Sequence, residues 1–177
     1  MNCQFRFSPV NIEHASLIHE WLAQDYIKEW IHGTGLKRTL DDLNIFLEKG
    51  KSEITHWIAF DGNTPIGYLL TSDIYPAEEF YQPYRQGKTA ITLDVFIGHR
   101  DYIGKGIAHL MIQNFLIQQF PTIDEVFIDP ELRNTRAIRV YEKAGFKILG
   151  EFIASWHPVP HYTMRLDMRD LIRKENL

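Results

Sequence analysis

The segment 90–119 places the tightest constraint on the fold of this chain. Residues 90–97 alternate between two faces, as a half-buried strand does. The turn Gly104-Lys105-Gly106 follows, and the next apolar residues, up to Gln119, are spaced like one face of a helix. Because a strand that leads through a glycine turn into a helix needs a sheet for that helix to pack on, we expect an α/β fold.

The rest of the chain alternates between strand and helix patterns. Strands are predicted at residues 5–7, 54–60, 66–70, 126–128, 146–153 and 162–166, and helices at residues 12–22, from Thr39 onward, and at 134–144. Asp61-Gly62 and Pro65 mark a hairpin, so the strands beside it are expected to pair antiparallel. Residues 73–88 show no period and are expected to form a loop. No repeat or linker marks a boundary, so residues 1–177 are predicted to form a single domain with an open, twisted, mixed sheet.

The charge and hydropathy of the chain exclude several classes of partner. With 19 basic and 23 acidic residues the net charge is −4, which disfavours binding to nucleic acid or to anionic lipid. No stretch approaches the roughly 20 apolar residues that span a bilayer. The first residues also lack the apolar core of a signal peptide, so a cytoplasmic protein is expected.

Cysteine and histidine give no indication of a metal site. Cys3 is the only cysteine, which excludes an intrachain disulfide and a multi-cysteine metal site. His157 and His161 are four residues apart, but Pro158 and Pro160 exclude the helix that would bring them together as ligands. We therefore expect no metal.

The glycine turn is suited to bind a pyrophosphate. Its glycines let the backbone come close to a ligand, and the first N–H groups and positive dipole end of the following helix favour an anion. The turn is not a dinucleotide-binding fingerprint, because His109 replaces the third glycine. It is not a Walker loop either, because Gly106 stands where Ser or Thr should bind magnesium. A plain tight turn is the alternative interpretation.

A second motif lies on the predicted helix 134–144. Asn134 and Tyr141 are seven residues apart, which brings them to within about 20° of each other around a helix. A phenol in that position can donate a proton to a thiolate leaving group. A tyrosine that only fills the core is the alternative interpretation.

Together the glycine turn and the Asn134–Tyr141 motif resemble the acyl-CoA-binding core of the GNAT superfamily of N-acetyltransferases. That resemblance implies a GNAT fold, a mixed, mostly antiparallel, twisted sheet flanked by helices, with a splayed strand pair that binds acyl-CoA. Acetyl-CoA is then the implied cosubstrate. The resemblance places its pyrophosphate on Ile103, Gly104, Lys105, Gly106, Ile107 and Ala108, its pantetheine on Phe96 and Ile97, and its remaining contacts, the sulfur included, on Asn134 and Tyr141. The chain departs from the superfamily at Asp101, where Gln or Arg is usual.

Further blocks extend the resemblance to bacterial aminoglycoside 6'-N-acetyltransferases. They follow in collinear order over most of the chain, as Glu20-Trp21-Leu22, Glu29-Trp30, Pro65-Ile66-Gly67-Tyr68, Asp129-Pro130 and residues 136–146. The resemblance implies that Asp94 and Asp129 hold ammonium groups of the antibiotic. Trp30, and Glu79 in the loop 73–88, are candidates for the wall of the substrate pocket.

The distribution of charge agrees with a cationic substrate. Residues 41–94 hold nine acids and four bases, whereas residues 99–147 hold seven bases and six acids. An acidic part beside a nearly neutral one fits a polycationic acceptor and an anionic cofactor. A difference this small also occurs on ordinary solvated faces.

The resulting hypothesis is an acetyl-CoA-dependent aminoglycoside 6'-N-acetyltransferase that acts in a ternary complex. Asp94 would accept the proton of the 6'-ammonium group, directly or through water, and Tyr141 would protonate the departing CoA thiolate. No covalent intermediate on the enzyme is expected, since Cys3 lies outside every motif. The alternatives are acetyl transfer to another amine, such as a siderophore precursor or a protein N-terminus, and a non-catalytic acyl-CoA-binding module.

Overall fold

The chain folds into two compact units. A computed structural model describes residues 3–74, 87–154 and 157–175. The first unit comprises Met1–Ser72 and Asp94–Ile107, and the second comprises Asp73–Leu93 and Ala108–Leu177. The boundary falls inside strand β4 (Ala90–Ile97), whose first half belongs to the second unit and whose second half belongs to the first.

The first unit consists of antiparallel strands with helices packed against them. Its elements are β1 (Phe5–Pro9), α1 (Ala15–Leu22), α2 (Asp25–Lys28), α3 (Gly33–Lys49), β2 (Thr55–Asp61) and β3 (Thr64–Asp73). Strand β2 pairs antiparallel with both β1 and β3, which confirms the predicted hairpin. Gly62 turns that hairpin with a φ of 57°, a conformation that favours glycine.

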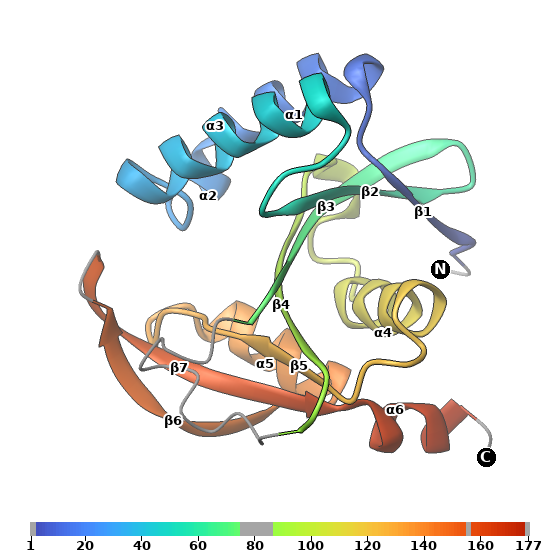
Figure 1. Cartoon of the computed structure of the whole chain (residues 1–177), viewed down its shortest axis with the longest axis vertical. Coiled ribbons are helices and arrows are strands. Elements are labelled where there is room, and N and C mark those ends of the chain that lie inside the picture. Colours follow the sequence, from blue (N-terminus) through green and yellow to red (C-terminus); the bar gives the residue numbers. More distant parts are fainter. Residues whose placement is uncertain (1–2, 75–86, 155–156, 176–177) are drawn as a thin grey trace. The chain divides into compact units, whose positions relative to one another are not determined.

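Apolar side chains from the helices and strands of the first unit form one core. Figure 1 shows α1 and α3 side by side on one face of β2 and β3. The buried side chains of this core include Ile18, Trp21 and Leu22 of α1, Leu43 and Phe46 of α3, Ile58 and Phe60 of β2, and Tyr68 and Leu70 of β3. Removing this apolar surface from water provides the main drive for folding of the unit.

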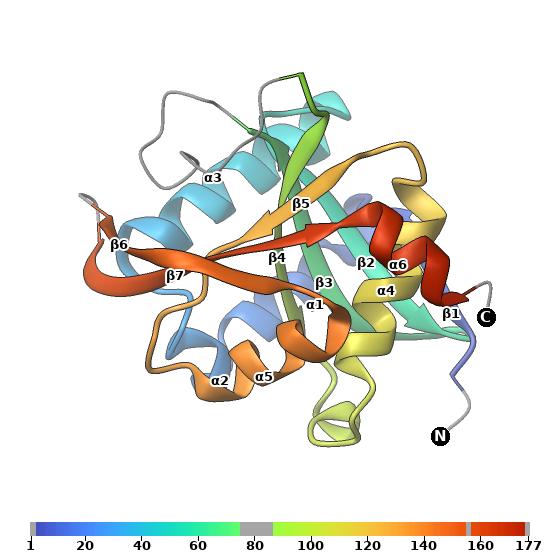
Figure 2. The ribbon, with the colours of Figure 1, turned by 90° about the horizontal axis from the view of Figure 1, so that it is seen from below.

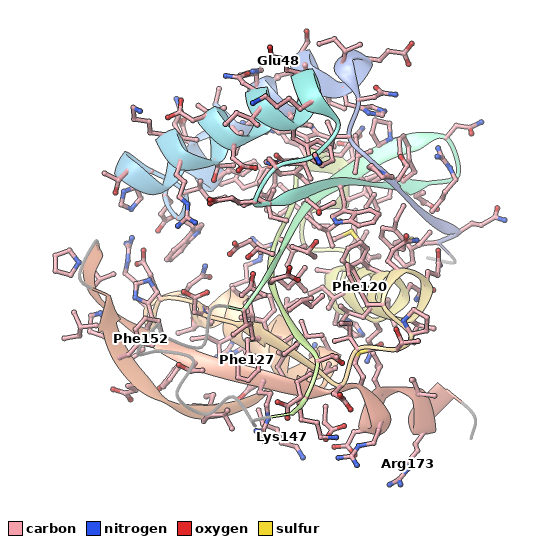
Figure 3. All side chains as sticks on the ribbon, in the orientation of Figure 1. Glu48, Phe120, Phe127, Lys147, Phe152 and Arg173 are labelled. Atoms are coloured by element: carbon pink, nitrogen blue, oxygen red, sulfur yellow. The ribbon has the colours of Figure 1, made fainter. Side chains whose placement is uncertain are left out.

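The second unit combines strands and helices from the C-terminal half of the chain. Its elements are α4 (Ala108–Gln119), β5 (Glu125–Ile128), α5 (Thr135–Ala144), β6 (Lys147–Ala154), β7 (His157–Asp167) and α6 (Met168–Glu175). Figure 2 shows β7 between β5 and β6, and it pairs antiparallel with both. Phe127 of β5, labelled in Figure 3, is fully buried and packs with Leu149 and Phe152 of β6.

The strands follow the order β1-β2-β3-β4-β5-β7-β6 in one sheet. Strands β4 and β5 pair in parallel, in a register that runs from Ala90–Glu125 to Thr92–Phe127, and β4 continues beyond it to Ile97. The sheet is therefore mixed and mostly antiparallel, which confirms the fold class expected from the sequence.

Helix α3 begins earlier than predicted, at Gly33 rather than at Thr39. The hydroxyl of Thr39 caps nothing, because it donates to the carbonyl of Gly35 one turn back inside the helix (3.0 Å). The N-cap is His32, in an extended conformation. The first turns of α3 were not predicted because they contain Gly33 and Gly35, and glycine is a poor helix former.

Other boundaries also differ from the predictions. The predicted helix 12–22 is a 3-10 turn (Ile12–His14) followed by α1, and Asn11 caps that turn through its Oδ1 atom. The patterns did not indicate α2 or α6. Strand β7 starts at His157 rather than at Tyr162, and its first residues, which include two prolines, pair with β6. On their other side, the carbonyl of Pro160 accepts from the N–H group of Leu132 (2.9 Å), and His161 forms a bridge with Glu131. Most of the predicted loop 73–88 lies outside the described residues.

Gly98, the residue after β4, allows α1 to pack against the end of that strand. A Cβ atom at this position would overlap the indole ring of Trp21, which is itself buried. The N–H group of Gly98 donates to the carbonyl of Ile66 in β3 (3.0 Å), so the backbone has little room to move away. The glycine is therefore required by packing rather than by an unusual φ.

We predict that Gly98→Ala lowers the free energy of unfolding by about 1–3 kcal/mol, because overpacking against Trp21 must be relieved by moving α1 or β4. Urea unfolding measures the change. Gly35→Ala is the control in the same unit, since nothing lies within 4 Å of its Cβ position, and it should leave the stability unchanged or raise it. A Gly98→Ala protein as stable as the wild type contradicts the packing argument.

Candidate active site

Asp94 lies on the second half of β4, at a position exposed to solvent. Desolvation by the atoms around it raises the pKa of the Asp94 carboxyl above its ordinary value, while the charge of Arg38 acts in the opposite direction. Because Asp94 stays open to solvent, a ligand group can reach it. A carboxyl with a raised pKa in that setting is suited to take up and release a proton.

Phe96 and Ile97 follow on the same strand and are half-buried. The Phe96 ring lies 5.4 Å from that of Tyr68, between ring centroids. The carbonyl oxygen of Ile97 accepts a hydrogen bond from the hydroxyl of Tyr26 (3.0 Å), a contact that the sequence did not indicate. A ligand that forms hydrogen bonds with the backbone of Phe96 and Ile97 must therefore share the Ile97 carbonyl with Tyr26 or bond to another backbone group of this strand.

The end of β4 is held by side chains from α2 and the residue before it. The Tyr26 hydroxyl also contacts the carbonyl of Gly98 (2.9 Å), and the Gln24 amide donates to the same oxygen (2.9 Å). Gln24 in turn accepts from Arg100 Nε (2.8 Å). The sequence did not indicate these positioning residues, because a single Tyr and a single Gln form no motif. The one nearby signal was the block Glu20-Trp21-Leu22, which is part of the resemblance to the family.

The glycine turn keeps the geometry that its sequence predicts. Gly104 and Gly106 have φ values of 77° and 74°, and both are exposed. The hydroxyl of Tyr102 ties the turn to Asp61 at the end of β2 (3.1 Å). Nothing lies within 4 Å of the position that a Cβ of Gly106 would take, so the space beside this residue is open. Such a turn lets a ligand approach the backbone closely.

In the second unit, the segment after β5 carries two acidic side chains. Asp129 is half-buried directly after β5, whereas Glu131 is nearly fully buried and accepts a hydrogen bond from Arg133 Nε (2.6 Å). The segment is fixed to β7, because Tyr162 N–H donates to the carbonyl of Pro130 (2.9 Å). Asp129 therefore lies on a segment that is hydrogen-bonded to β7.

Asn134 and Tyr141 lie at the two ends of α5. Asn134 is the N-cap residue, and its Oδ1 atom accepts from the N–H group of Ala137 (3.1 Å), which leaves the amide Nδ2 outside this bond. Tyr141 is only 8% exposed, and its ring lies 6.0 Å from that of Phe146. The helix ends at Gly145 with a φ of 113°. Asn134 thus has a structural task that the sequence analysis did not assign to it.

We predict that Asn134→Ala lowers the free energy of unfolding by about 1 kcal/mol, because the N–H group of Ala137 loses its acceptor. Asn134→Asp is the matched control, since a carboxylate also caps a helix and suits its positive end. Urea unfolding compares the two variants with the wild type. Equal stability of all three proteins contradicts a capping role.

The remaining predicted site residues are placed as follows. Trp30 is half-buried just after α2, and Glu79 lies outside the described residues. Asp94, Phe96, Ile97 and residues 103–107 belong to the first unit, whereas Ala108, Asp129, Asn134 and Tyr141 belong to the second. Within residues 3–74, 87–154 and 157–175, no group of three or more His, Cys, Asp or Glu side chains has the arrangement of a metal site. No helix in this part of the chain is long and apolar enough to cross a membrane.

Fold and motifs together define a class of enzyme. The family model of the acetyltransferase (GNAT) domain matches residues 11–154, which span parts of both units. The chain therefore belongs to the GNAT family of acetyltransferases, and the resemblance stated from its sequence is confirmed.

Three relatives locate the chain within that family. It is 48% identical to an aminoglycoside N(6')-acetyltransferase of Legionella pneumophila, whose structure it matches with a TM-score of 0.88 over 98% of both chains. It is 27% identical over 140 residues to an aminoglycoside N(6')-acetyltransferase type 1 of Klebsiella pneumoniae, which covers 76% of this chain and 70% of that one. The structure of AAC(6')-Ib with coenzyme A and kanamycin matches with a TM-score of 0.76 at 20% identity, over 98% of this chain and 100% of the other, and shows the shared fold.

Proposed function

We propose that this protein transfers the acetyl group of acetyl-CoA to the 6'-amine of an aminoglycoside and so confers resistance to the antibiotic. The observation that carries the proposal is the 48% identity, over 98% of both chains, to the Legionella pneumophila aminoglycoside N(6')-acetyltransferase. Acidic residues at 94 and 129, each on or directly after a strand, supply the charge that ammonium groups of such a substrate need.

Asp94 acts on the attacking amine. At neutral pH an alkyl amine is protonated and cannot attack a thioester, so a base must take its proton. Asp94 is accessible, and its raised pKa makes it a better base than an ordinary aspartate. It accepts the proton from the ammonium group directly or through water, and the free amine then attacks the acetyl carbonyl carbon. The C–N bond forms as the C–S bond breaks, and the nitrogen then gives up a second proton, which replaces the one that Tyr141 donates to the thiolate.

Tyr141 acts on the leaving group. Its hydroxyl donates a proton to the CoA thiolate, which makes the departing group a thiol and prevents the reverse attack. Burial of most of the Tyr141 side chain, and its contact with Phe146, hold the ring in one orientation. A covalent route through Cys3 is disfavoured, because burial and the charge of Asp61 raise the pKa of that thiol and so reduce the thiolate fraction.

The glycine turn and Asn134 bind the cosubstrate. The exposed glycines at 104 and 106 fit a pyrophosphate, because their backbone carries no side chain and the space over Gly106 is open. Lys105 is exposed between them and adds a positive charge. Helix α4 begins two residues after Gly106, so its positive end also favours the phosphates. The Nδ2 atom of Asn134 stays available to a ligand while Oδ1 caps α5.

The purified protein should acetylate kanamycin, and Asp94→Asn should lower kcat/KM roughly 10- to 150-fold, because the base and one charge-assisted hydrogen bond are lost. Protonation of Asp94, whose pKa is raised, should lower kcat/KM of the wild type as the pH falls, and this fall should disappear in the Asp94→Asn variant.

Asp129→Asn should chiefly raise KM for kanamycin, since we place Asp129 at a remote amine. Release of CoA, followed by thiol titration, measures all of these quantities.

The same assay separates the alternatives. Acetylation of a neutral or acidic amine with kanamycin left unmodified contradicts the aminoglycoside proposal but keeps an acetyltransferase. Tight binding of acetyl-CoA without release of CoA in the presence of any amine indicates a binding module.

We predict that Tyr141→Phe keeps the fold and the affinity for acetyl-CoA but lowers kcat about 10²-fold, because only the proton donor is removed. Single-turnover kinetics isolate the chemical step, and calorimetry checks the affinity. Wild-type single-turnover rates in this variant leave Tyr141 with a packing role alone.

A further inference from the structure

A groove of about 520 Å³ opens along α3 in the first unit. The residues that line it come from α3 and from the segment that leads to β2, and they are Thr34, Lys37, Arg38, Asp41, Asp42, Ile45, Ser52 and Glu53. Apart from the effect of Arg38 on Asp94, no part of the catalytic scheme above uses them. The groove is rich in charge and is therefore suited to a polar ligand.

Asp42 is the most constrained residue of the groove. Its Oδ1 atom accepts hydrogen bonds from Ser52 Oγ (2.6 Å) and from His56 Nε2 (2.8 Å). Its side chain keeps 10% of its surface open, in the groove that it lines. No hydrogen bond from the described residues reaches Oδ2. One oxygen thus anchors the carboxylate, and the other remains for a ligand.

The histidine behind Asp42 does not neutralise it. His56 is fully buried, and burial lowers the pKa of its imidazole, although Asp42 acts in the opposite direction. Because a carboxylate only accepts hydrogen bonds, Nε2 of His56 carries the proton, and Nδ1 is left to accept from the hydroxyl of Tyr68. The neutral tautomer satisfies both neighbours, so His56 places no buried cation beside the Asp42 carboxylate.

The cations of the groove are paired with other acids. Lys37 contacts Asp41 (2.8 Å), and Arg38 contacts Glu53 (3.8 Å). Among the described residues, neither lysine nor arginine lies within ion-pair distance of Asp42. Asp42 is therefore the acid of the groove that has no lysine or arginine partner among the described residues, and this favours a cationic ligand there.

Arg38 relates the groove to Asp94 of β4 through its charge. This side chain lines the groove, and its positive charge opposes the rise that desolvation causes in the pKa of Asp94. Both carboxylates belong to the first unit, so an acceptor with several amines has two acidic anchors there, with Arg38 acting on both regions.

We propose that the groove at Asp42 is an additional ammonium-binding subsite, besides the one proposed at Asp129, and that it holds a remote amino group of the polycationic acceptor whose reacting amine lies at Asp94. The inference rests on the proposed function for the identity of the acceptor. The ammonium group donates to Asp42 Oδ2, and the exposed side chain of Ile45 offers an apolar contact to the ring that carries it. A metal ion is a poor alternative, since one anchored carboxylate oxygen does not fill a coordination shell.

The test compares kanamycin, which has several amines, with 6-amino-6-deoxyglucose, which has only the reacting one. Asp42→Asn keeps both acceptor bonds of Oδ1 and removes the charge. It should raise KM for kanamycin about five- to tenfold more than KM for the single-amine sugar. Glu48→Gln is the matched control, because it removes an acid from the same helix outside the groove (Figure 3), and it should leave the ratio of the two KM values unchanged. An equal change in both KM values for Asp42→Asn overturns the subsite.

A second measurement uses the wild-type protein and does not depend on the folding of a variant. With CoA bound, kanamycin should shift the amide resonances of Thr34, Ile45 and Ser52. Shifts confined to residues near Asp94 overturn the subsite. If kanamycin is acetylated and these groove resonances do not move, the subsite is wrong and the proposed function stands. If kanamycin is not acetylated, the proposed function is wrong, and the groove shifts with kanamycin still decide whether the cation site exists.

Discussion

The contact between Trp21 and Gly98 is the constraint around which the first unit is built. The indole ring occupies the space where any other residue would place its Cβ atom, so α1 packs against the end of β4 only because residue 98 is glycine. Tyr26 and Gln24, from the same region of the chain as Trp21, contact the carbonyls of Ile97 and Gly98. The second half of β4 and the glycine turn are thus held by a buried ring and by hydrogen bonds, and a site with supports of both kinds keeps its geometry when a ligand binds.

The acidic side chains of the first unit differ in what surrounds them, and this difference decides what each can do. Asp41 and Glu53 form exposed ion pairs, which contribute little to stability and exchange readily with other charges. Asp94 is solvent-accessible and partly desolvated, so it is suited to proton transfer. Asp42 is anchored on one oxygen by a neutral histidine, so it is suited to hold a cation in place. A count of acids in the sequence treats all of these residues alike.

Local signals allowed much of the fold to be predicted. The alternation of residues 90–97, the hairpin at Gly62 and the helix from Asn134 to Gly145 are encoded by neighbouring residues, and the structure contains all three. The start of α3 was missed because two glycines and a threonine in its first turns mimic a loop and a cap. Helix α2 is too short to show a period. The early start of β7 was missed because Pro158 and Pro160 are unusual inside a strand.

The sequence by itself determined the family of this protein, since the glycine turn and the Asn134–Tyr141 spacing are local patterns that a family shares. It also determined which residues are candidates for the chemistry. Only the tertiary structure decided which atoms of these residues remain available to a ligand. Asn134 uses its Oδ1 atom as a helix cap, and the carbonyl of Ile97 already accepts from Tyr26. Asp42, which the sequence did not indicate, has one of its two oxygens engaged. The physical reason is that a hydrogen bond or a desolvated charge depends on groups far apart in the chain, and no local pattern records which distant groups meet.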